Sequence, residues 1–165
     1  MIRTLVFALS AGFALIAGSA SAQDYAPQRV VASVDNDDLR AIVQSLDHEL
    51  IDFEDEGEVS VGGRAEDGTK YLLIGTACDV AGVEGCQGVM MQVRFDPVES
   101  VTDADLARAN LGQAAILTWR DTSDGTLGMT RYVVLDHGIT MANLRENVLV
   151  LLSITPLIID TLVGD

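Results

Sequence analysis

A long apolar stretch near the carboxyl end of this 165-residue chain limits what the chain can fold into. From residue 148 to residue 159, leucine, isoleucine and valine fall on nearly every side of a helix. Thr140 can cap that helix, which is predicted to begin at Met141, and Pro156 is expected to kink it or divide it. The stretch is shorter than a membrane span and too apolar to face water. We therefore expect it to be buried or to contact another subunit.

The same helix supplies the candidate interface residues. Four large apolar side chains from its second half are the most plausible contacts with a partner: Leu151, Leu152, Leu157 and Ile158. A surface built from such side chains is typical of protein association. The prediction is a protein partner, with a homodimer formed through residues 141–163 as the more local hypothesis.

The rest of the chain alternates between helical and extended patterns. Apolar spacing of three and four predicts a helix in residues 35–52, capped by Asp35 or Asn36, and Thr102 can cap a second helix at residues 103–110. Five segments have strand-like composition and are separated by turn signals: residues 58–62, 70–77, 87–95, 114–120 and 127–135. The order α-β-β-β-α-β-β-α predicts an α+β domain with helices packed on an antiparallel sheet.

The amino end has the pattern of a secretory signal peptide. Arg3 precedes an apolar run at residues 5–16, and small residues lead to a cleavage site after Ala22. We expect residues 1–22 to be removed, residues 23–34 to form a tail, and residues 35–163 to form one domain. The predicted location is the bacterial periplasm or the exterior, with no membrane span left after cleavage.

The charge of the chain is strongly negative. It has 25 acidic and 10 basic residues, for a formal net charge of −15. Such a surface repels phosphate backbones, so direct binding to nucleic acid is not expected. An evenly solvated negative surface is the simplest interpretation, and basic or cationic partners are the sharper one.

The two cysteines, Cys78 and Cys86, flank a glycine-rich loop between two predicted antiparallel strands. In an oxidising compartment, opposed residues at the mouth of a hairpin favour a structural disulfide. Two alternatives remain. One is a zinc site that also uses His48 and His137, and the other is a thiol redox centre, although the spacing is wider than C-x-x-C.

No catalytic constellation is visible elsewhere. The chain has no G-x-S-x-G elbow, no H-E-x-x-H motif and no phosphate-binding glycine loop, so we predict no catalytic residues, no metal and no cofactor. Trp119 and Tyr132 lie on successive predicted strands. Cross-strand packing explains them most simply, and an aromatic platform for a ligand is the alternative.

The order of these segments, the cysteine hairpin and the sequence RYVVLDHGITMANLRENV at residues 131–148 resemble the YbjN family, over about residues 35–162. Members of that family are described as candidate regulators of bacterial sensory transduction. The resemblance implies a fold similar to type III secretion chaperones and carries no catalytic residues. One departure is that the family often has a Trp-Asn pair before the fourth strand, where this chain has Asn110-Leu111-Gly112-Gln113.

Two functional classes follow. The first is an exported, non-enzymatic regulator or chaperone-like adaptor that acts by binding another protein. The second is a small-molecule-binding protein or an enzyme, with a pocket between the sheet and the helices.

Overall fold

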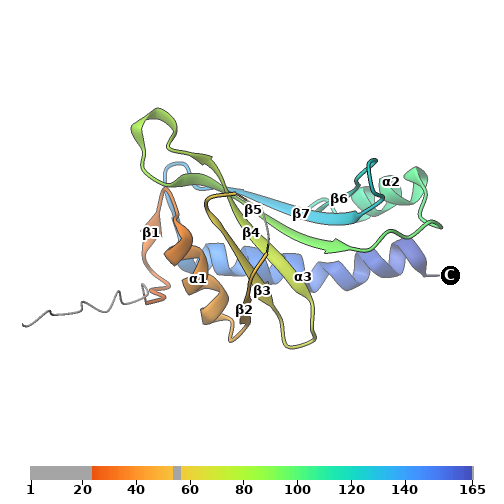
Figure 1. The fold of residues 1–165 in the computed structure, drawn as a ribbon, viewed down its shortest axis with the longest axis horizontal. Helices are drawn as coiled ribbons and strands as arrows, with labels where there is room; N and C mark the ends of the chain where they lie inside the picture. Colours follow the sequence, from red (N-terminus) through yellow and green to blue (C-terminus); the bar gives the residue numbers. More distant parts are fainter. Residues whose placement is uncertain (1–23, 54–56, 165) are drawn as a thin grey trace, which may run out of the picture.

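The computed structural model describes residues 24–53 and 57–164, so the predicted signal peptide at residues 1–22 lies outside the described residues. The core of the fold is a six-stranded antiparallel sheet in the order β2-β3-β4-β5-β7-β6 (Figure 1). Its strands are β2 (Glu49–Ile51), β3 (Ser60–Arg64), β4 (Lys70–Cys78), β5 (Cys86–Phe95), β6 (Leu117–Arg120) and β7 (Leu127–Val134). The predicted α+β class with an antiparallel sheet is confirmed.

Three helices accompany the sheet: α1 (Asn36–Ser45), α2 (Asp103–Gly112) and α3 (Met141–Val163). Helix α3 runs along one face of the sheet, against β5 and β7, and α2 lies at the far end beside β6 and α3 (Figure 1). Each helix begins at a side chain that accepts a hydrogen bond from the backbone N–H three residues later: Asp35 from Asp38, Thr102 from Asp105, and Thr140 from Asn143. These side chains satisfy donors that the first turn of a helix leaves free, which is why the predicted starts are accurate.

The segment before α1 is part of the fold rather than a tail. β1 (Val30–Val31) pairs with β8 (Ile139–Thr140) in a second, two-stranded sheet. Val31 and Val34 are buried in the main core, and Val34 also bridges to Cys86. The domain therefore includes residues that the sequence pattern assigned to the expected tail at residues 23–34.

The first helix is shorter than predicted. It ends at Ser45, and the chain reverses through Asp47, whose φ is 57°. Leu50 continues the helical spacing of apolar residues, but it lies in β2, where it pairs with Gly63 of β3. Pairing with the sheet outweighs local helix periodicity here. The predicted order α-β-β-β-α-β-β-α therefore omits β1, β2 and β8.

Two adjacent glycines in β3 let aromatic rings lie on both faces of the sheet. A Cβ atom built on Gly63 would lie 2.3 Å from the ring of Tyr71, and one built on Gly62 would lie 2.3 Å from the ring of Phe53. Glycine removes the side chain that would otherwise hold each ring away from the backbone. Tyr71 consequently lies flat across β3 on the helix-covered face, where it is almost fully buried.

Helix α3 is one continuous helix of 23 residues, and Pro156 does not divide it. Pro156 is exposed, so its ring lies on the solvent side of the helix and does not disturb the buried stripe. By length and composition α3 could cross a membrane, which corrects the expectation, based on residues 148–159 alone, that it is too short. The side chains that it buries repeat every three or four residues: Met141, Leu144, Val148, Leu151, Thr155, Ile158 and Leu162.

Candidate functional site

A groove of about 760 Å³ runs beside the face of α3 that points away from the sheet. One wall is α3 itself, and the other is formed by the β3–β4 turn and by His48, just before β2. In Figure 1 this turn and the end of α1 extend below α3. The lining residues come from three separate parts of the chain: His48, Ala65, Glu66, Asp67, Glu146, Leu149, Val150, Leu152 and Ser153.

The α3 wall of the groove is mainly apolar. Leu149, Val150 and Leu152 supply its hydrophobic surface, and each is only partly buried. Ser153 is exposed and donates a hydrogen bond to the carbonyl of Val150 at 3.1 Å. Leu149 and Val150 thus form a second apolar strip on the helix, and Leu152, at its edge, also packs against the core.

The rim of the groove is acidic. Glu66 and Asp67 project from the β3–β4 turn, and Glu146 lies on the first half of α3. The backbone N–H of Thr69 donates to Asp67 at 2.9 Å, and hydrogen bonding from Thr69 lowers the pKa of that carboxyl below its ordinary value. Arg145 donates to Glu146 at 3.2 Å and to the carbonyl of Ser45 at 3.4 Å, so this cation is held on its own chain.

His48 is held in place by Tyr71. The Nδ1 atom of His48 and the hydroxyl of Tyr71 lie 3.0 Å apart, and the two rings meet edge-on with centroids 5.7 Å apart. Burial raises the pKa of Tyr71, so the hydroxyl remains protonated. If the hydroxyl donates to Nδ1, the proton of neutral histidine is on Nε2.

The charge of His48 depends on several neighbouring groups. Burial is the main cause that lowers its pKa, and Arg145 acts in the same direction, while Asp67 and Asp47 oppose them. His48 is therefore mainly neutral near neutral pH, so it adds little positive charge to the acidic rim.

The structure separates the four predicted interface residues. Leu151 and Ile158 are completely buried in the protein's own core, so they cannot face a partner while the domain is folded. Leu152 is partly buried and lines the groove, and Leu157 is 53% exposed. Sequence reasoning missed Leu149 and Val150. The three- and four-residue repeat that begins at Met141 could have indicated which side chains of this helix face inward.

Trp119 and Tyr132 lie on the same face of the sheet, opposite the main helices, but each lies over a glycine rather than over the other. A Cβ atom at Gly128 would lie 2.0 Å from the Trp119 ring, and one at Gly88 would lie 2.2 Å from the Tyr132 hydroxyl. Within the described residues, ring contact occurs only between His48 and Tyr71. A ligand platform at Trp119 and Tyr132 stays a prediction.

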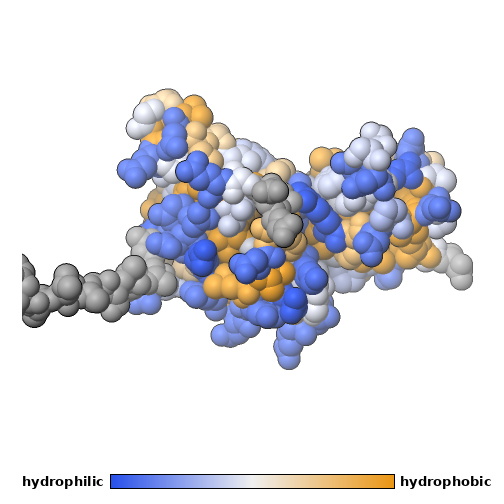
Figure 2. Space-filling view, viewed as in Figure 1, coloured by the Kyte–Doolittle hydropathy of each residue, from blue (hydrophilic) through white to orange (hydrophobic). Residues whose placement is uncertain are grey.

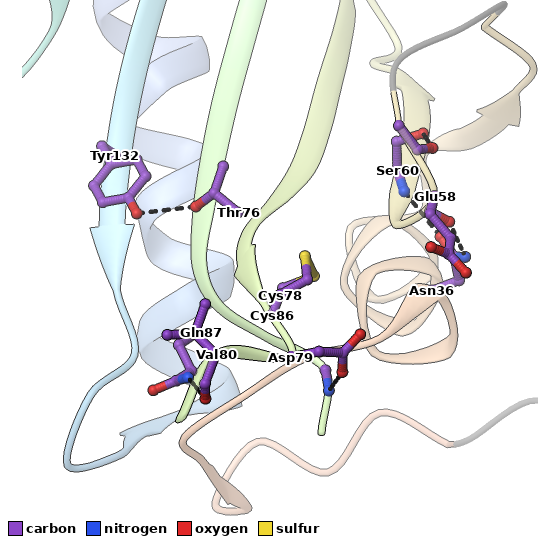
Figure 3. The surroundings of a disulfide bond; sticks show 12 residues. Asn36, Glu58, Ser60, Thr76, Cys78, Asp79, Val80, Cys86, Gln87 and Tyr132 are labelled. Atoms are coloured by element: carbon purple, nitrogen blue, oxygen red, sulfur yellow. Dashed lines mark hydrogen bonds between the residues drawn. A yellow bond between two sulfur atoms is a disulfide. The ribbon is translucent and has the colours of Figure 1, made fainter. Parts of the chain in front are cut away.

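Both outward aromatic side chains are hydrogen-bonded. Trp119 donates from Nε1 to the hydroxyl of Thr130 at 2.8 Å, and the hydroxyl of Tyr132 lies 2.9 Å from that of Thr76 (Figure 3).

Elsewhere on the molecular surface, Figure 2 shows a hydrophobic patch over β2 and β3, where Leu50 and Phe53 are exposed. This patch is separate from the groove beside α3.

The predicted disulfide is confirmed. Cys78 and Cys86 are bonded to each other at the mouth of the β4–β5 hairpin, where they are directly opposed in the sheet (Figure 3). Both sulfur atoms are used in this bond, so neither is a thiolate available to zinc. His137 is exposed in the turn before β8, with a φ of 64°. In residues 24–53 and 57–164, no three histidine, cysteine or acidic side chains are grouped to hold a metal.

Comparison with known proteins gives a structural likeness. No protein-family model matches the chain, and no curated protein sequence matches it. The structure is similar to that of YbjN from E. coli, described as a candidate transcription regulator, with a TM-score of 0.55 and 13% sequence identity. The match covers 78% of this chain and 95% of YbjN. The two proteins share a fold. At this identity the likeness extends to the fold alone.

Chains from two protein complexes are also similar in structure to this chain, with lower TM-scores than YbjN. The HopA1–SchA chaperone–effector complex matches with a TM-score of 0.49 and 15% identity, covering 72% of this chain and 90% of that chain. The ExsC–ExsE complex matches with a TM-score of 0.44 and 11% identity, covering 62% and 74%. Likenesses at these scores are too slight to carry an argument about partners.

Proposed function

We propose that this protein is an exported, non-enzymatic adaptor or regulator that binds another polypeptide through the outward face of α3. The observation that carries the proposal is that α3 has apolar side chains on two faces, while the domain fully buries only one of them. Leu149, Val150 and Leu152 line an open groove, and Leu157 is exposed farther along the same helix. Apolar side chains gathered beside a groove are typical of a surface that binds a partner.

The same helix favours a folded domain over a membrane span. Its buried stripe packs against β5 and β7 and continues to Leu162 near its end. Its outer surface also includes Glu146, Ser153 and Asp160, all of which are exposed. Charged groups on the lipid-facing side of a span are costly, whereas at the edge of a protein groove they remain hydrated.

Two features support export. The disulfide between Cys78 and Cys86 is of the kind that persists in oxidising compartments, and it closes a loop on the surface of the domain. The signal-peptide pattern at residues 1–22 precedes the first described residue. The fold shared with YbjN is consistent with a regulatory role, and the proposal needs no catalytic group.

In-cell photo-cross-linking tests the proposal. A photoreactive residue placed at Ser153, on the groove wall, should form an adduct with a second polypeptide, and Leu149→Asp should abolish it. Ser100 is an exposed serine outside the groove and provides the matched control position. Equal adducts from both positions, or none from Ser153, would contradict the proposal. An adduct containing only two copies of this chain would support the homodimer hypothesis instead.

A further inference from the structure

The groove beside α3 combines an apolar wall with an acidic rim, and this combination restricts what it can bind. Leu149, Val150 and Leu152 favour an occupant with apolar side chains. Glu66 and Asp67 stand on the opposite wall and are exposed. An occupant that covers the apolar wall therefore places its own edge beside these carboxylates.

The carboxylates of the rim are incompletely neutralised. Among the described ion pairs, Glu146 has Arg145 as its partner, while Glu66 and Asp67 have no cationic partner. His48 is mainly neutral near neutral pH, and Asp47 adds a further negative charge beside it. Two cations flank the β3–β4 turn: Arg64 is paired with Glu49, and Lys70 is exposed, so Glu66, Asp67, Glu146 and Asp47 still outnumber the unpaired cations here. The rim is thus negatively charged, and it belongs to a chain whose net charge is −15.

The negative charge of the rim disfavours binding of a second copy of this chain and favours a partner with positive charge. Two copies related by a two-fold axis across the groove would bring Glu66, Asp67 and Glu146 close to their own counterparts. Like charges brought together at an interface oppose binding, whereas lysine or arginine side chains would be attracted. The groove is therefore complementary to a cationic occupant.

We propose that the groove binds a segment of a partner polypeptide in which lysine or arginine side chains flank apolar ones. The apolar side chains lie against Leu149, Val150 and Leu152, and the cations lie beside Glu66, Asp67 and Glu146. This inference rests on the proposed function and adds the chemical class of the partner. Attraction of this kind weakens as salt concentration rises.

The probe for the test is a fluorescently labelled amphipathic peptide of leucine and lysine, with a matched peptide that has glutamate in place of lysine. Binding to the protein is measured by fluorescence anisotropy at low and at high salt. The lysine peptide should bind more tightly than the glutamate peptide, and its affinity should fall with added salt.

Two charge-matched variants make the test specific to the groove. Glu66→Gln, Asp67→Asn and Glu146→Gln together remove three rim charges, and asparagine at residue 67 can still accept the hydrogen bond from Thr69. Glu84→Gln, Glu99→Gln and Asp124→Asn remove three exposed charges outside the groove. The rim variant should lose affinity about tenfold, as expected for three exposed ion pairs, and the remote variant much less. Circular dichroism checks that both variants are folded.

Three results would overturn the inference: equal losses in the two variants, equal binding of the two peptides, or no binding of either. The cross-linking test separates this failure from failure of the proposed function. If Ser153 captures a polypeptide that is not cationic and amphipathic, the adaptor proposal stands while the inference about the partner's charge is wrong.

Discussion

Both faces of α3 carry large apolar side chains, but the environments of these side chains differ. The inward face repeats at intervals of three and four residues and is buried against the sheet, with Leu151 and Ile158 fully covered. The outward face carries Leu149, Val150 and Leu152 beside an acidic rim and an open groove. The comparison teaches that the position of an apolar side chain in the repeat decides whether it is buried in the core or lines the groove.

The largest expected effect comes from making the same leucine-to-alanine substitution on each of the two faces and comparing the loss of stability. Leu151→Ala should lower the free energy of unfolding by about 3 kcal/mol, because it removes a buried side chain and leaves a cavity. Leu149→Ala should change it by less than about 1 kcal/mol, because that side chain is only partly buried. Urea denaturation of both variants measures the difference. Equal losses of stability would show that the two faces do not differ in this way.

The second prediction concerns how closely the buried Tyr71 ring packs on the backbone of β3. Gly63→Ala places a methyl group 2.3 Å from the buried Tyr71 ring and should cost about 2 kcal/mol through overpacking. Gly112→Ala, at the end of α2, is the matched control, because no atom lies within 4 Å of its added methyl group. Thermal denaturation should show a lower Tm only for Gly63→Ala. An unchanged Tm in that variant would mean that the ring can move aside at little cost.

A substitution at the exposed Pro156 is expected to raise the stability of the protein, whereas the two preceding substitutions lower it. Because the proline is exposed within a continuous helix, Pro156→Ala restores a backbone donor and should raise the free energy of unfolding by about 1 kcal/mol or more. Guanidinium denaturation measures this gain. A loss of stability would instead indicate that the proline ring itself makes a contact that the fold requires.

The smallest expected effect is the pH dependence contributed by His48 at the groove. Its pKa in the folded protein lies below the ordinary value, so the unfolded chain binds more protons as pH falls below about 6.5. Stability should therefore decrease from about pH 7 to about pH 5, and less steeply in His48→Gln. Comparing urea midpoints of the two proteins separates His48 from the many carboxylates. Identical pH profiles would remove His48 as a contributor.

Local signals predicted much of the fold. Thr102 and Thr140 mark the starts of α2 and α3. The side chain of each threonine accepts a hydrogen bond from the backbone N–H three residues later in the chain. Cys78 and Cys86 indicated the disulfide through their place beside a turn. In contrast, β2 was missed because Leu50 continues the spacing of α1, and only its pairing with Gly63 shows that it is extended.

The site was harder to predict than the fold. Leu149, Leu151 and Leu152 are the same residue type, so composition cannot tell which of them the sheet covers. The groove also joins residues that are far apart in the chain, namely His48, the β3–β4 turn and α3. His48 was assigned to a helix, and its contact with Tyr71 depends on the pairing of β3 with β4 and on the absence of a side chain at Gly63.

The most direct test of the central claim is methyl NMR of the protein during titration with the leucine–lysine peptide. The account predicts chemical-shift changes at the methyl groups of Leu149, Val150 and Leu152, with those of the buried Leu151 and Ile158 much less affected. Changes centred on exposed apolar residues elsewhere, such as Val80 in the cysteine loop or Leu117 on β6, would contradict it. The absence of any change at the groove would contradict it equally.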